Sequence, residues 1–256
     1  TNIATVPHYS VFRYPGGKTW LIPTIRKWIK HIGRPLEFIE PFAGGGVVSL
    51  TMAMERLSKS VTMVELDPDV AAVWQTVLSS DAKWLANKIL GFQLTRKAAI
   101  EVTTKQPSNT RERAFATIVK NRTHYGGVLA SGAGMTKLGE GGKGLSSRWY
   151  PETLAKRIKR IYRYRDTINF IHGDGLLEME RAAGLRDSAV FIDPPYTSSS
   201  KSPGRRLYNY NEVNHDLIFQ LASRLPGDVF MTYDDDPDTR SRADAHGLLI
   251  NEIQMQ

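Results

Sequence analysis

Short apolar, β-branched runs recur along the chain, and several are separated by patterns typical of amphipathic helices. Six of these runs predict strands: Leu36–Glu40, Ser60–Glu65, Ile168–His172, Ala189–Asp193, Asp228–Tyr233 and Leu248–Ile253. Strands that alternate with helices indicate a mostly parallel sheet with helices on both faces. We therefore expect an α/β fold.

The second and third predicted strands are separated by about a hundred residues. This length is far greater than a simple crossover between parallel strands needs. We interpret Gln75–Arg165 as an inserted, mainly helical lobe, and residues 1–74 and 166–256 as the two parts of one domain.

The predicted lobe contains two kinds of sequence. Arg111–Arg122 and Leu154–Tyr164 have the pattern of amphipathic helices, and the polar face of the second is strongly basic. Between them, Gly126–Ser147 carries eight glycines, too many for a stable helix. A glycine-rich loop between basic helices suits a surface that closes on a nucleic acid, although a solvated helix face beside a loop would give the same pattern.

The overall charge also favours a polyanionic partner. The 256 residues include 34 Lys and Arg against 26 Asp and Glu, a net charge of +8. The chain has no cysteine, which excludes disulfides, thiolate metal sites and a cysteine nucleophile. The six histidines show no metal-ligand spacing, so no metal site is predicted. The first residues do not resemble a secretion signal, and no run reaches the length of a membrane span, so we expect a cytoplasmic protein without membrane association.

The first candidate site is the segment FIEPFAGGGVVSL, Phe38–Leu50. An apolar strand runs into three glycines and then into an apolar helix, which lets the backbone approach a ligand closely. An acid about twenty residues later is expected to bind a ribose, and Glu65 lies at that distance. The motif is weak alone, because Ser49 replaces the third glycine of the dinucleotide fingerprint. Asp67 competes for the ribose, but Asp67–Pro68 is typical of a helix cap, the role that we favour for it.

The second candidate site is the segment FIDPPY, Phe191–Tyr196, at the mouth of a predicted strand. Proline lacks an N–H, so the turn Asp193–Pro194–Pro195 offers hydrogen-bond acceptors and few donors. Acceptors of this kind suit a substrate amine, and Tyr196 could stack on a flat ring. A structural Pro-Pro turn is the alternative interpretation.

Taken in order, these segments resemble the motifs of Dam-like DNA adenine methyltransferases. The matching segments are RYPGGK (Arg13–Lys18), EPFAGGG (Glu40–Gly46), Glu65, Gly173–Asp174 and DPPY (Asp193–Tyr196). ERAFATIVKNRTHYGG, Glu112–Gly127, resembles the segment that opens the target-recognition region of that family. The resemblance covers about Phe12 to Asp238. It implies a class I Rossmann-like methyltransferase fold, S-adenosyl-L-methionine as cofactor, duplex DNA as partner and the 6-amino group of a flipped adenine as target.

The resemblance also implies a role for each motif residue. The methionine end of the cofactor would be held by Tyr14, Pro15, Gly16, Gly17 and Lys18, with Lys18 facing its carboxylate. The central part would be lined by Glu40, Phe42, Ala43 and Gly44. Glu65 would take the ribose hydroxyls, and Asp174 would accept from the cofactor's adenine amine. The target base would be held by Asp193, Pro194, Pro195 and Tyr196, with Asp193 also beside the cofactor.

Candidates for DNA contact come from the lobe and from the segment after the Pro-Pro turn. They are Arg122, Tyr125, Lys137, Arg148, Lys201 and Arg205. Gly126 departs from the family pattern, so the recognised DNA sequence is not inherited. The family fold continues into an antiparallel edge strand after the sixth strand, for which we assign no segment.

Other interpretations stay open. The same fold could methylate RNA or a protein amide, and the target could be the 4-amino group of cytosine in place of the adenine amine. A binding module of this fold without catalysis is an alternative of another class. A phosphate loop at Lys18–Thr19 is excluded, because Phe12 stands where that motif requires glycine. The cluster Asp234, Asp235, Asp236 and Asp238 is interpreted as capping rather than cation binding. We expect a monomer or a weak dimer.

Overall fold

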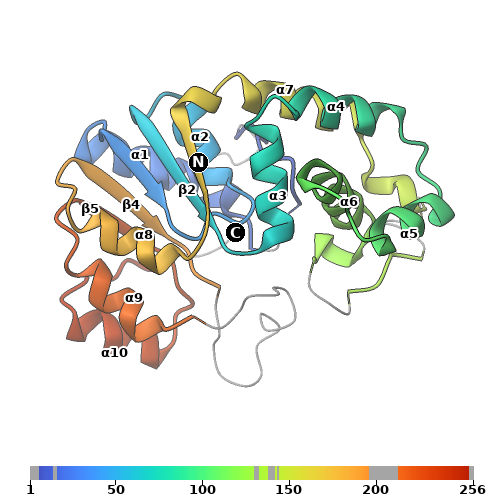
Figure 1. The fold of residues 1–256 in the computed structure, drawn as a ribbon. Coiled ribbons are helices and arrows are strands. Elements are labelled where there is room, and N and C mark those ends of the chain that lie inside the picture. Colours follow the sequence, from blue (N-terminus) through green and yellow to red (C-terminus); the bar gives the residue numbers. More distant parts are fainter. Residues whose placement is uncertain are drawn as a thin grey trace.

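The computed structural model describes residues 6–13, 16–129, 133–137, 142, 144–195 and 213–253. These residues contain a five-stranded sheet in the order β3-β2-β1-β4-β5, with every pair parallel (Figure 1). The strands are β1 (Glu37–Glu40), β2 (Ser60–Glu65), β3 (Ile168–His172), β4 (Ser188–Ile192) and β5 (Asp228–Met231). The predicted α/β class is confirmed, and five of the predicted strands form within two residues of their expected bounds.

Successive residues of each strand point to opposite faces of the sheet, and both faces are covered. On one face, Phe38 and Phe191 join a core with α1 (Ile22–Ile32), α2 (Val47–Met54) and α3 (Pro68–Val77). On the other, Ile39, Val190 and Ile192 join a smaller core with α8 (Gly175–Ala182) and α9 (His215–Ala222). The chain then continues into α10 (Pro237–Ala245). Near-continuous apolar strands are expected when both faces of a parallel sheet are buried.

The segment between β2 and β3 is mainly helical. After α3 come α4 (Ala82–Gly91), α5 (Arg96–Thr104), α6 (Thr110–Thr123) and α7 (Pro151–Tyr162), with α6 packed on α3 and α7 packed on α4. Short 3₁₀ turns occur at Lys18–Leu21, Tyr125–Gly127, Leu145–Arg148 and Arg165–Thr167. The predicted lobe boundary at Gln75 falls inside α3, and the buried residues of α6 and α7 share one core with the sheet. The division into two domains therefore stays a prediction.

The predicted sixth strand, Leu248–Ile253, is wrong. Gly247 ends α10 with a positive φ of 67°, and the Leu248 N–H donates to the Ala243 carbonyl. Beyond that point Leu249 is 95% exposed, and among the described residues β5 pairs with β4 alone. The segment has the apolar pattern of a strand, but it meets no partner strand among the described residues.

Candidate functional site

The strand order reverses between β1 and β4, and we call the region at the carboxyl ends of these two strands the crevice. In open α/β sheets this switch point is where ligands bind. β1 ends at Glu40, β2 ends at Glu65, and Asp193 directly follows β4. The topology therefore brings the acids of the predicted motifs to one edge of the sheet.

The glycine turn after β1 is fixed by close packing. Gly46, directly before α2, has φ +63°, and a Cβ there would lie 2.6 Å from the Met63 side chain and 2.9 Å from the Trp74 ring. The Trp74 Nε1–H donates to the Gly44 carbonyl at 2.9 Å. The backbone N–H of Ala43 donates to the Val64 carbonyl at 2.9 Å. Only glycine fits Gly46, and the turn is held rigidly against β2 and α3.

Glu40 is 3% exposed and holds the first turn of α2. Its Oε2 accepts hydrogen bonds from the Ser49 backbone N–H, at 2.9 Å, and from the Ser49 hydroxyl. Burial raises the pKa of Glu40 to about 8; the bonds from Ser49 oppose that rise, and the charge of Asp193 adds to it. In the sequence, Ser49 stands out only as a departure from the glycine fingerprint. In the structure, its hydroxyl donates to the buried carboxyl group of Glu40.

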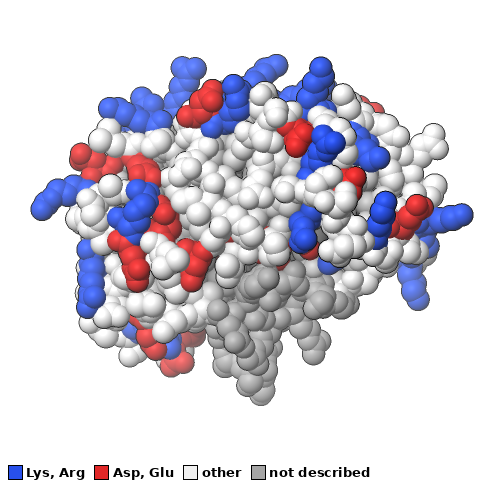
Figure 2. All heavy atoms as spheres, viewed as in Figure 1, with Lys and Arg blue, Asp and Glu red and all other residues white. Residues whose placement is uncertain are grey.

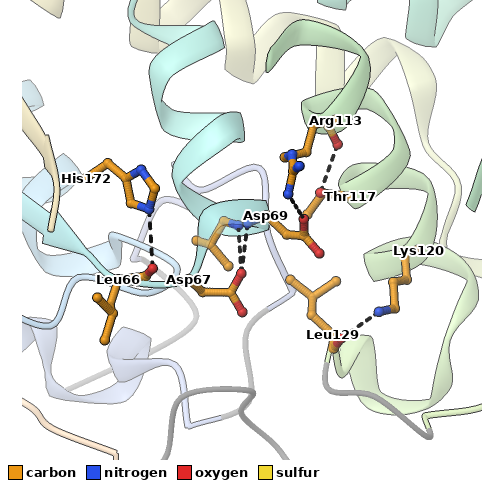
Figure 3. A network of polar contacts seen from close by, with 9 residues as sticks. Leu66, Asp67, Asp69, Arg113, Thr117, Lys120, Leu129 and His172 are labelled. Carbon is orange, nitrogen blue, oxygen red and sulfur yellow. Dashed lines mark hydrogen bonds and ion pairs between the residues drawn. The ribbon is translucent and has the colours of Figure 1, made fainter. Parts of the chain in front are cut away.

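Glu65 ties the glycine turn to the start of α3. One carboxylate oxygen accepts from the Gly44 N–H at 2.9 Å and the other from the Asp67 N–H at 2.8 Å. Burial raises its pKa to about 7, with a smaller rise from the charge of Asp67. Asp67 in turn accepts from the N–H groups of Asp69 and Val70, at 2.8 and 3.4 Å (Figure 3). The capping interpretation of Asp67 is confirmed.

The carboxylate of Asp193 is engaged at both oxygens. The Lys18 ammonium lies 2.7 Å from Oδ2, and the Thr232 hydroxyl donates to Oδ1 at 2.6 Å. The Lys18 ammonium also donates to the Gly16 carbonyl at 3.1 Å. Lys18 therefore faces a carboxylate of the protein itself, and it brings the segment before η2 (Lys18–Leu21) to the end of β4. Thr232, directly after β5, was missed by the sequence analysis because its relation to Asp193 depends on the pairing of β5 with β4.

The remaining cofactor candidates also line this edge. Asp174 follows β3, is exposed, and caps α8 by accepting from the Leu176 N–H at 2.9 Å. A Cβ on Gly175 would lie 2.2 Å from the Pro41 carbonyl oxygen, so α8 starts in close contact with the turn after β1. Phe42 is partly buried, and Pro194 is buried directly after Asp193. Tyr14, Pro15, Tyr196, Lys201 and Arg205 lie outside the described residues.

The side chain of Arg122 is buried, whereas contact with DNA requires an exposed side chain. Its side chain is 5% exposed, and the guanidinium donates to the Val11 carbonyl. Burial lowers its pKa to about 9, and the charges of Arg157, Arg13 and Arg148 lower it further. The prediction that Arg122 contacts DNA is therefore corrected: the buried side chain anchors the N-terminal segment under α6.

The other described candidates for DNA contact lie nearer the surface. Tyr125 is 74% exposed, Lys137 is exposed and Arg148 is partly buried.

Nearby, the side chain of Asn121 forms a bridge that the sequence analysis missed. Its Oδ1 accepts from the Arg13 N–H at 2.9 Å, and its Nδ2 donates to the carbonyls of Arg13 and Gly127, each at 2.8 Å.

Polar contacts also connect α6 to the crevice (Figure 3). Arg113 on α6 pairs with Asp69 on α3 at 3.2 Å, two residues after the cap Asp67. Further along α6, the Lys120 ammonium donates to the Leu129 carbonyl at 2.6 Å. The helix that opens the predicted recognition segment is thus fixed to the helix that starts beside Glu65.

The acids after β5 serve local structure. Asp236 caps α10 by accepting from the Thr239 N–H at 2.8 Å, and Asp235 pairs with Arg240 at 2.7 Å. These contacts support the capping interpretation of this cluster. Among the described residues, no helix has the length and apolar character to cross a membrane.

Comparison with known proteins gives two findings. A family model described as D12 class N6 adenine-specific DNA methyltransferase matches residues 14–226. The chain is also 22% identical to the Type II methyltransferase M.MjaIII of Methanocaldococcus jannaschii, over 82% of this chain and 76% of that protein.

Proposed function

Because the chain belongs to the D12 class N6 adenine-specific DNA methyltransferases, we propose that it takes the methyl group from S-adenosylmethionine at the crevice between β1 and β4. The target is the 6-amino group of an adenine extruded from duplex DNA. The observation that carries the proposal is the position of Asp193, at the end of β4, with its carboxylate fixed by Lys18 and Thr232.

The charges at the crevice fit a cationic methyl donor. The charge of Asp193 contributes to the raised pKa of Glu40, so carboxylates face one another at this edge of the sheet. A positive ligand placed beside them would favour the ionised form of Glu40, which burial holds protonated to higher pH than an ordinary glutamate. Glu65 accepts backbone hydrogen bonds from Gly44, Asp67 and Leu66, and its two oxygens together have four lone pairs, so it keeps acceptor capacity for a hydroxyl group. S-adenosylmethionine would supply a sulfonium methyl group at this place.

The residues of the chain would align and polarise the amine. Asp193 would accept a hydrogen bond from the adenine amine, and it would stabilise the positive charge that develops on the nitrogen as the N–C bond forms and the S–C bond of the donor breaks. The donor would leave as a neutral thioether, and the amine would then lose one proton. Pro194 has no N–H, so its carbonyl offers an acceptor without a competing donor. Because Lys18 holds Asp193 at 2.7 Å, the carboxylate is oriented before the base arrives.

The lobe of residues 75–165 would bind the duplex in this proposal. Exposed Tyr125 and Lys137 support contact there, and base extrusion costs a few kcal/mol that the pocket must recover. Asp174, which caps α8 at the edge of the crevice, is proposed to contact the adenine end of the donor.

The test is transfer of a labelled methyl group from S-adenosylmethionine to unmethylated duplex DNA, followed by digestion to nucleosides. We expect N6-methyladenine with the wild type. Asp193→Ala should lose transfer by at least 10³-fold, on the order of 4 kcal/mol of transition-state stabilisation, and keep donor binding in calorimetry.

Asp228→Ala is the matched control, because Asp228 is an exposed acid at the opposite end of the strand beside β4. It should leave transfer unchanged. Full transfer by Asp193→Ala, or label found in RNA or protein in place of DNA adenine, would contradict the proposal.

A further inference from the structure

Positive charge is concentrated in one part of the chain. Residues 75–165 hold 18 Lys and Arg and 5 Asp and Glu, whereas the whole chain has a net charge of +8. The remaining residues are therefore net negative. In Figure 2, Lys and Arg side chains gather along the upper rim, over the part of the molecule where Figure 1 places α7 and α4.

After the first turn of α7, which carries Glu152, the solvent face of the helix and the following residue Arg163 form a basic stripe. Leu154, Ala155, Ile158 and Ile161 are buried, which fixes the orientation of the helix. The opposite face exposes Lys156, Lys159, Arg160 and Arg163, spaced i, i+3, i+4 and i+7. At 1.5 Å per residue the stripe is about 10 Å long, which corresponds to about three base pairs of duplex.

The four cations of the stripe differ in their partners from six arginines on other helices. Elsewhere, Arg26, Arg111, Arg113, Arg181, Arg240 and Arg242 each pair with a carboxylate of another element or turn. Within the described part of the chain, no carboxylate pairs with a cation of the stripe. The Arg160 guanidinium lies 4.6 Å from the centre of the Tyr9 ring, which holds it in place without neutralising it.

The stripe lies away from the candidate active site. α7 leads through the turn Arg165–Thr167 into the amino end of β3, whereas Glu65 and Asp193 lie at the carboxyl ends of β2 and β4. The helix therefore runs toward the edge of the sheet opposite the crevice.

We infer that Lys156, Lys159, Arg160 and Arg163 bind the phosphate backbone of a second DNA segment while the target duplex occupies the crevice. The inference extends the proposed action on DNA, and it adds a second binding surface without sequence preference, since phosphate contacts carry no base information. Such a surface would keep the protein close to a long DNA between transfer events.

The test is a bridging assay, which needs no methyl transfer. Unlabelled duplex is fixed on beads, protein is added, and capture of a second, fluorescent duplex is measured. We expect capture by the wild type in the absence of a methyl donor. Lys159→Glu/Arg163→Glu should reduce capture at least tenfold and lower the magnitude of its salt slope by about 2, one phosphate contact per cation. Binding of a 12-base-pair duplex in solution should stay within twofold.

Arg186→Glu/Arg224→Glu is the control, because it reverses two exposed charges outside residues 75–165. It should keep capture, and equal melting temperatures would establish that all variants are folded. If the α7 variant still bridges, two copies of the crevice account for capture and the inference is wrong. Equal losses in the α7 variant and the control would also overturn it. Since the assay contains no methyl donor, it reports bridging alone, and failure of the methylation proposal would be recognised separately.

Discussion

Replacing Glu40 by Gln should change how the stability of the protein depends on pH. Glu40 is 3% exposed, and burial raises its pKa to about 8, whereas an ordinary glutamate titrates near 4.5. In the native state the side chain therefore stays protonated to higher pH than in the unfolded chain. Between these two pKa values the native state binds more protons, so stability falls as pH rises. The contribution is fully present below about pH 4.5 and is lost as pH rises through about 8.

The size of the effect follows from the shift. One pKa unit corresponds to about 1.4 kcal/mol, so the wild type should lose on the order of 4 kcal/mol between pH 5 and pH 9 through Glu40 alone. Glu40→Gln keeps the shape and an acceptor for the Ser49 N–H, and it cannot ionise. The other titrating groups, including Glu65, are present in both proteins and cancel in the difference. The difference in unfolding free energy should therefore rise with pH in favour of the variant.

Urea unfolding at pH 5, 7 and 9 measures this difference directly. Glu180→Gln is the control, because Glu180 is an exposed residue of α8. Its difference from the wild type should not vary with pH. Parallel stability curves for Glu40→Gln and the wild type across this range would refute the argument that Glu40 is held in a desolvated environment.

Two further substitutions test the glycine turn and the support of Asp193. Gly46→Ala should lower the unfolding free energy by about 2 to 5 kcal/mol, because the new Cβ meets the Trp74 ring and Gly46 has a positive φ. Urea titration measures this loss, and a loss below about 1 kcal/mol would contradict the packing around Gly46. Thr232→Val should lower kcat for methyl transfer by about tenfold with little change in donor affinity, whereas Thr232→Ser should restore kcat, since only the hydroxyl reaches Asp193; equal rates for the two variants would refute this role.

The sheet could be predicted from the sequence because both of its faces are buried. Strands such as β2 and β4 are nearly continuous apolar runs, and their composition alone distinguishes them from loops. Leu248–Ile253 has a similar composition, but a strand also needs a neighbour with free backbone groups. Whether one is present depends on the path of the chain, which a local pattern does not contain.

The candidate site could be predicted in part for a related reason. Glu65 ends one apolar strand and Asp193 follows another, and parallel strands place such residues at one edge. Thr232 and Asn121 gain their roles from partners far away in the sequence, and nothing in their immediate neighbours marks them. Arg122 shows the opposite error: residue type indicates charge, but it does not indicate that the side chain is buried under a backbone carbonyl.

The bridge formed by Asn121 has a thermodynamic consequence. The Asn121 amide connects Arg13, at the start of the RYPGGK segment, to Gly127, in the turn that ends the recognition motif. Arg13 is 108 positions from Asn121 in the sequence, and Gly127 is six positions from it. A shift of the turn on DNA therefore acts on the segment that leads to Lys18 and Asp193. Coupling between two binding sites is reciprocal. If DNA changes the affinity for the methyl donor by some factor, the donor must change the affinity for DNA by the same factor.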